Sequence, residues 1–144
     1  MKVSTRTRYG IRAAVELAQQ YEQAPLQLRI IGQHQDISVK YLEQLMAMLK
    51  GSGLVKSVRG ARGGYMLTRA PSQIRMDDIF HCLEGQAATL ECVENAGSCK
   101  RAMDCAARGL WTKVDRAINE ALRSVTLQDL ADKAKSGARQ EYEI

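Results

Sequence analysis

The sequence predicts a mainly α-helical protein, a winged helix-turn-helix with a small β-hairpin wing and a long C-terminal helix. Three observations support this prediction. Apolar residues recur at helical spacing, i, i+3 and i+4, over several segments of the chain. Two short alternating stretches flank a glycine-rich turn at residues 60–64, as in a β-hairpin. The longest helical pattern covers about residues 105–124, and its apolar stripe is wide enough to require a packing partner.

Length and composition limit the class of protein. At 144 residues the chain has the length of about one domain, and 45% of its residues are apolar, which excludes a disordered chain. No apolar run reaches the length of a membrane span, and the charged, amphipathic N-terminus does not resemble a signal peptide. We therefore expect a cytoplasmic protein without membrane contact. Disulfides are rare in that compartment, so the four cysteines indicate metal ligands or reactive thiols.

Charge is unevenly distributed along the chain. Residues 1–75 contain 12 Lys and Arg against 4 Asp and Glu, a net charge of +8, whereas residues 76–144 carry a net charge of −3. Phosphate contacts supply most of the non-specific affinity for DNA, so the basic head suits a duplex-binding protein. A solvated basic surface without a partner fits the charge equally well. The motifs distinguish these two interpretations.

Three helices are predicted within residues 5–50. The first covers about 5–20, the second runs from 28 to about 36, and Ser38 is a good N-cap for a third helix that ends near residue 50. The third helix turns one apolar face inward and presents on its other face Lys40, Tyr41, Gln44 and Met48. This arrangement indicates a helix-turn-helix, although an ordinary helical hairpin has the same pattern.

A β-hairpin is predicted directly after the third helix. Residues 54–59 and 65–68 alternate as strands around the turn at 60–64, whose glycines allow the backbone to approach a duplex closely. Arg59 and Arg62 lie at the tip, where such a wing can insert a cation into the minor groove. A simple hairpin turn does not need these arginines. Residues 1–75 are therefore interpreted as a winged helix-turn-helix DNA-binding domain.

Residues 76–136 are predicted to form an effector loop and dimerisation helices. A short helix at about 76–85 precedes an irregular stretch, 86–104, and the longest helix. Thr126 caps a final helix with Asp129 at the capping-box position, and the charged tail 137–144 is expected to fray. The apolar stripe of the longest helix can pack on the chain's own head or on a second subunit. Because DNA-binding helices usually act as a two-fold pair, we expect a homodimer.

Three cysteines lie close together before the longest helix: Cys92, Cys99 and Cys105, with six and then five residues between them. Thiolates are preferred ligands of iron–sulfur clusters and of zinc, and thiols can also act as redox groups. Cys82, the fourth cysteine, lies beside apolar residues and is interpreted as a buried, inert thiol. Clustered thiols behind a DNA-binding head predict a sensor that regulates transcription.

An enzyme is the least favoured class. The sequence contains no paired carboxylates, no nucleophile with a base, no Walker loop and no dinucleotide fingerprint. The glycine-rich turn at 60–64 lies between two strands rather than before a helix, which is the wrong context for cradling a phosphate.

Several sequence strings together resemble one family. Residues 4–10 (STRTRYG), 37–45 (ISVKYLEQL) and 54–65 (LVKSVRGARGGY), with the three cysteines and residues 126–130, resemble the IscR-like bacterial winged-helix regulators, the IscR, NsrR and CymR relatives. The resemblance covers nearly the whole chain. It implies a dimeric transcription factor, more commonly a repressor, that binds double-stranded operator DNA. The DNA contacts that it implies are Ser38, Lys40, Tyr41, Glu43, Gln44, Arg59 and Arg62.

By the same resemblance, Cys92, Cys99 and Cys105 match the ligands of an iron–sulfur cluster, either 2Fe–2S or 4Fe–4S. Relatives supply a fourth ligand as a histidine three residues after the last cysteine or as an acidic residue in the first helix. This chain has Arg108 and Arg8 at those positions. The remaining candidates are a non-protein ligand or one of Glu91, Glu94, Asp104 and His34 of the partner subunit.

Three hypotheses for the thiols follow. The first is a sensor of iron–sulfur cluster, redox or nitric oxide status that holds a cluster on the three cysteines. The second is the same DNA-binding dimer with zinc-binding or redox-active thiols. The third is a CymR-like regulator controlled by a protein partner.

Overall fold

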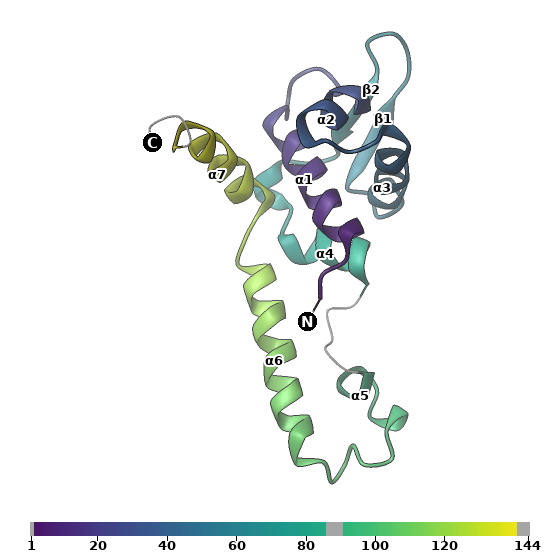
Figure 1. The fold of residues 1–144 in the computed structure, drawn as a ribbon, viewed down its shortest axis with the longest axis vertical. Helices are drawn as coiled ribbons and strands as arrows, with labels where there is room; N and C mark the ends of the chain where they lie inside the picture. Colours follow the sequence, from purple (N-terminus) through teal and green to yellow (C-terminus); the bar gives the residue numbers. More distant parts are fainter. Residues whose placement is uncertain (1, 86–90, 141–144) are drawn as a thin grey trace.

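The computed structural model describes residues 2–85 and 91–140 (Figure 1). The head contains α1 (Thr5–Gln19), α2 (Leu28–Gln35), α3 (Val39–Gly51), β1 (Val55–Val58) and β2 (Gly64–Leu67). The chain continues through the 3-10 turn η1 (Pro71–Gln73), α4 (Met76–Glu84), the single-turn α5 (Glu91–Glu94), η2 (Ala96–Ser98), α6 (Ala106–Arg123) and α7 (Leu127–Gln140). The fold is mainly helical with a small antiparallel hairpin, as the sequence predicts. Short helical turns interrupt the stretch predicted to be irregular, of which residues 86–90 lie outside the described residues.

Local capping explains where two of these helices begin. The hydroxyl oxygen of Ser38 accepts a hydrogen bond from the amide of Tyr41 at 3.2 Å, at the start of α3. At the start of α7, the amide of Asp129 donates to the Thr126 hydroxyl at 3.1 Å, and the amide of Thr126 donates to the Asp129 carboxylate at 2.9 Å. Both caps confirm the predicted starts. The helix α7 extends to Gln140, beyond the point where the sequence predicts a frayed tail; residues 141–144 lie outside the described residues.

One apolar core joins the head to α4 and α7. Its fully buried side chains come from elements on both sides of residue 75 and include Leu17, Ile31, Leu42, Leu45, Met46, Leu49, Ile74, Ile79, Leu83 and Leu127. Leu127 and Ala131 belong to α7, which packs on α1. The core therefore crosses the boundary that the sequence places at residue 75.

The wing is anchored to the segment before α2. β1 and β2 pair antiparallel, with Val55 opposite Leu67. Leu26 pairs in turn with Tyr65, and both amide-to-carbonyl distances are 2.9 Å. Gly64 has a φ of +152°, and a Cβ atom there would lie 2.5 Å from the carbonyl oxygen of Leu26. Only glycine suits this position, because the backbone at Leu26 approaches so closely.

The long helix α6 extends away from the head (Figure 1). None of its side chains is buried within the chain, and Leu110 is 54% exposed. The apolar stripe of α6 is therefore not fully buried against the head of its own chain. No helix within the described ranges is long and apolar enough to cross a membrane.

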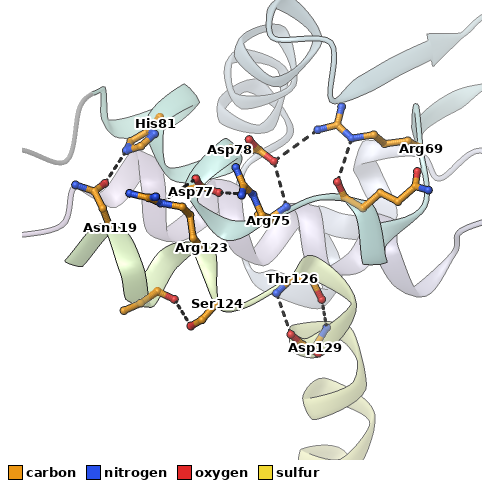
Figure 2. Close-up of polar contacts among 12 residues, drawn as sticks. Arg69, Arg75, Asp77, Asp78, His81, Asn119, Arg123, Ser124, Thr126 and Asp129 are labelled. Carbon is orange, nitrogen blue, oxygen red and sulfur yellow. Dashed lines mark hydrogen bonds and ion pairs between the residues drawn. The ribbon is translucent and has the colours of Figure 1, made fainter. Parts of the chain in front are cut away.

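A polar junction joins the end of α6 to α4 (Figure 2). The buried carboxylate of Asp77 lies 3.2 Å from Arg75 Nε and 4.0 Å from Arg123 Nε. One turn later in α4 and one turn earlier in α6, His81 Nε2 and Asn119 Oδ1 lie 3.3 Å apart. These contacts tie the orientation of α6 to α4, which itself packs on α1 and α3.

Candidate nucleic-acid interface and thiol loop

The predicted DNA-contacting residues of α3 share one surface. The helix buries its apolar face in the core and leaves Lys40, Glu43 and Gln44 exposed, with Ser38 exposed at its start. Tyr41 is half-buried because its ring packs edge-on against the ring of Tyr9 in α1, with centroids 6.0 Å apart and an interplanar angle of 86°. The fold thus presents these five side chains around the N-terminal half of the second helix of the helix-turn-helix.

A buried carboxylate that the sequence analysis missed holds the helix-turn-helix together. Glu16 of α1 is buried, and its carboxylate accepts a hydrogen bond from Gln35 Nε2 at 2.7 Å. His34 Nδ1 lies 3.2 Å from the same carboxylate. Asp36 then adopts a left-handed conformation, with φ of +54°, that turns the chain toward α3. A charged residue within the apolar stripe of α1 was the only sequence signal for this contact. His34, a candidate cluster ligand, is engaged here within its own chain.

The wing arginines are exposed at the tip of the hairpin. Arg59 follows β1 and Arg62 lies two residues before β2. No carboxylate oxygen in the described part of the chain lies within 4 Å of either guanidinium group. Gly63 keeps the turn tight, since a Cβ atom there would lie 2.1 Å from the carbonyl oxygen of Val58. Both cations are therefore accessible to a phosphate or a groove.

The three clustered cysteines do not converge in this structure. Cys92 is half-buried on α5, whereas Cys99 and Cys105 are exposed, and all three are free thiols. Within residues 2–85 and 91–140, no group of three or more Cys, His, Asp or Glu side chains is placed to hold a metal ion. The donor chemistry suits an iron–sulfur cluster, because thiolates are its usual ligands. Binding one at these thiols requires the segment 92–105 to rearrange.

Arg108 occupies the position at which the family resemblance places a histidine ligand. Its Nε donates a hydrogen bond from α6 to the carbonyl oxygen of Cys92 at 3.1 Å. A protonated guanidinium group has only donors, so this side chain cannot coordinate a metal ion. Arg108 instead links the first cysteine of the loop to the beginning of α6.

Cys82 lies apart from the other thiols, on α4 against the end of α3. Its thiol donates to the carbonyl oxygen of Met48 at 3.3 Å and accepts from the hydroxyl of Ser52 at 3.0 Å. The side chain is half-buried rather than buried as predicted, because it lines a surface cleft of about 370 Å³ together with Arg69 and His81.

The end of α4 also holds the beginning of α1. The carboxylate of Glu84 accepts hydrogen bonds from the Ser4 amide at 3.1 Å, from the Ser4 hydroxyl at 2.7 Å and from the Thr7 hydroxyl. These bonds, led by the one from Thr7, lower the pKa of Glu84 below its ordinary value. In addition, Arg6 Nε donates to the carbonyl oxygen of Leu83 at 2.7 Å. These hydrogen bonds thereby link the end of α4, the helix that precedes the three cysteines, to the beginning of α1.

Comparison with known proteins places this fold in a family. The family model for Rrf2, described as an iron-dependent transcriptional regulator, matches residues 3–133. The chain belongs to the Rrf2 family. The HTH-type transcriptional regulator CymR of Bacillus subtilis (strain 168) is 42% identical over 131 residues, which cover 91% of this chain and 90% of that protein.

Solved structures of Rrf2-type regulators match the same fold. The structure of CymR (YrzC), the global cysteine regulator of B. subtilis, has a TM-score of 0.78 and 41% identity and covers 92% of this chain and 98% of that chain. The structure of T. potens IscR has a TM-score of 0.77 and 39% identity, with coverage of 95% and 90%. These comparisons confirm the predicted winged-helix regulator and the absence of an enzymatic function in the family. The CymR and IscR structures thus resemble this chain to nearly the same degree.

Proposed function

We propose that this Rrf2-family protein is a dimeric repressor that binds operator DNA through α3 and the wing and senses its signal through the loop cysteines. The observation that supports it best is the placement of the two surfaces. The head presents α3 and the exposed Arg59 and Arg62, which have no carboxylate partner among the described residues. The three thiols lie before α6, which extends away from the head. A signal at the loop can therefore reach the head through α6.

Each proposed DNA contact has a chemical function. Ser38 and Lys40, at the start of α3, suit phosphate oxygens, and Gln44 with Tyr41 suits base edges in the major groove. Glu43 can accept a hydrogen bond from a cytosine amine or repel unsuitable sequences. Arg59 enters the minor groove, and Arg62 adds an accessory cation.

We propose that the apolar stripe of α6 packs against the same helix of a second subunit. The exposure of Leu110 and the lack of buried side chains on α6 support this pairing, because an uncovered apolar stripe of this length favours association. A two-fold pair would place the recognition helices about 34–36 Å apart, one turn of duplex.

For the thiols we propose an iron–sulfur cluster on Cys92, Cys99 and Cys105. When bound, a cluster would take the three thiolates as ligands of one inorganic centre and so would restrain the loop. In this chain the restraint passes to α6 through Cys105, directly before the helix, and through the bond from Arg108 to Cys92. The second candidate is zinc-binding or redox-active thiols, and the exposure of Cys99 and Cys105 supports the redox form of it. Control by a protein partner is the CymR-like alternative.

The visible absorption spectrum, with iron and sulfide analysis, of protein purified without oxygen tests the cluster. A brown protein whose chromophore disappears in Cys99→Ala, while the protein keeps its helical circular dichroism, supports the proposal. A colourless protein that does not accept a reconstituted cluster would overturn the proposed cluster in favour of zinc-binding or redox-active thiols. A zinc analysis separates those two.

The wing is tested on the operator. With a duplex selected by the wild-type protein from a random library, Arg59→Ala should weaken binding and reduce the salt slope, since it removes a groove cation. Arg116→Ala is the control, because Arg116 is exposed on α6. Unchanged affinity of Arg59→Ala at moderate salt contradicts the wing assignment.

A further inference from the structure

The residue directly before α2 points its side chain toward the wing. Gln27 occupies the N-cap position of α2, yet its side chain makes no capping hydrogen bond. Its Nε2 instead reaches the wing and lies 3.4 Å from the carbonyl oxygen of Ala61, to which it donates. At the other end of the same amide, Oε1 accepts a hydrogen bond from Arg29 Nη2 at 3.1 Å. A chain of polar contacts thus runs from Arg29 through Gln27 to the wing tip.

The backbone fixes where this chain of contacts begins. Leu26 pairs with Tyr65 of β2 through two hydrogen bonds of 2.9 Å, and Gly64 packs against the Leu26 carbonyl. Gln27 follows directly, so its side chain starts from a position that is set relative to the wing. Ala61 lies in the turn between Arg59 and Arg62, the two arginines of the proposed minor-groove contact.

The charge of Arg29 has no partner in the described part of the chain. Its side chain is exposed, and no carboxylate oxygen within the described ranges lies within 4 Å of it. Among the described residues its side chain donates to a neutral amide, which leaves the other donors of the guanidinium group available. A guanidinium group presents its donors in a planar fork that matches the oxygens of a phosphate, and an amide partner can hold that fork in one orientation.

We propose that Arg29 binds a backbone phosphate of the duplex beside the wing, and that Gln27 is the positioning residue that aligns Arg29 with the wing tip. This inference rests on the proposed DNA binding by the wing. It adds a contact from the first helix of the helix-turn-helix to those of α3 and the hairpin. Because a phosphate contact carries no sequence information, Arg29 contributes to affinity on every duplex.

The charge contribution is tested by fluorescence anisotropy on the selected operator and on a scrambled duplex, over a series of salt concentrations. Arg29→Gln should raise Kd about 3- to 10-fold on both duplexes, the effect of one lost hydrogen-bonded contact. The salt slope should fall by about 0.9, the value for one released phosphate contact. Arg116→Gln removes the same charge from α6 and should change neither quantity by as much. An Arg29→Gln protein with the wild-type salt slope overturns the phosphate contact.

The positioning by Gln27 is tested with a variant that removes no charge. Gln27→Ala should weaken binding about 2- to 5-fold, because the wing tip and Arg29 lose a hydrogen-bonded link. Its melting temperature should stay close to that of the wild type, since the side chain does not cap α2. In a double-mutant cycle, Gln27→Ala should have a smaller effect in the Arg29→Gln background. Effects that multiply independently show that Gln27 does not position Arg29.

Parallel measurement of Arg59→Ala separates failure of this inference from failure of the proposed wing contact. If Arg59→Ala weakens binding and Arg29→Gln does not, the wing contact stands and the Arg29 contact is wrong. If only Arg29→Gln reduces the affinity and the salt slope, the phosphate contact stands and the wing assignment is wrong. If neither variant changes operator binding, both are wrong.

Discussion

Replacing Glu84 by glutamine tests how strongly the end of α4 holds the head. The carboxylate accepts three hydrogen bonds at the beginning of α1, two from Ser4 and one from Thr7. All three bonds go to Oε2, so the amide oxygen of a glutamine can take the same place, and the substitution removes the negative charge of the acceptor. Hydrogen bonds to a charged group contribute about 1.5–3 kcal/mol, and partial exposure of Glu84 to water lowers this, so we expect a loss of about 1–2 kcal/mol at pH 7.

The dependence on pH has a definite sign. Folding lowers the pKa of Glu84 below its ordinary value of 4.5, so the native state favours the charged carboxylate. The stabilisation is therefore complete above about pH 4.5 and is lost as the pH falls below it. The difference in free energy of unfolding between wild type and Glu84→Gln should be largest near neutral pH and should shrink in acid.

Urea denaturation followed by far-ultraviolet circular dichroism measures this difference at neutral and acidic pH. All proteins are compared at one concentration, because association adds to apparent stability. Glu22→Gln is the matched control, since Glu22 is exposed in the loop after α1. A Glu84→Gln protein as stable as the wild type at pH 7 refutes the reasoning, as does a loss that persists unchanged in acid.

Three further substitutions test the packing. Leu127→Ala should lower the free energy of unfolding by about 2–5 kcal/mol, because a fully buried leucine of α7 leaves a cavity; a small change in urea denaturation would show that α7 is not part of the core. Gly64→Ala should cost about 1–3 kcal/mol of backbone strain, in addition to the clash with Leu26, and wild-type stability would contradict the observed wing geometry. Leu110→Asp should convert the proposed dimer to a monomer in sedimentation equilibrium, because it charges an exposed apolar stripe, whereas Arg116→Asp should not; a dimeric Leu110→Asp places the interface elsewhere.

The elements of the head were predictable because their signals are local. The serine cap of α3 and the Thr126–Asp129 box act over three residues, so the sequence alone indicates where those helices begin. The hairpin follows from alternation around a glycine-rich turn, and its arginines are visible in the same few residues. Short-range periodicity likewise placed Lys40 and Gln44 on the outer face of α3.

Long-range packing decided the remaining features. The contacts of Leu127 with the head core, of Arg108 with Cys92 and of Gln27 with the wing each join segments that are distant in the chain or in different elements. The spacing of the cysteines indicates their chemistry, yet their separation in space depends on how α5, η2 and α6 pack. The sequence by itself determined the helices, the wing and the regulator class, since periodicity and caps are properties of neighbouring residues. Only the tertiary structure decided which side chains meet, because the energies of burial and of long-range hydrogen bonds arise once distant segments are in contact.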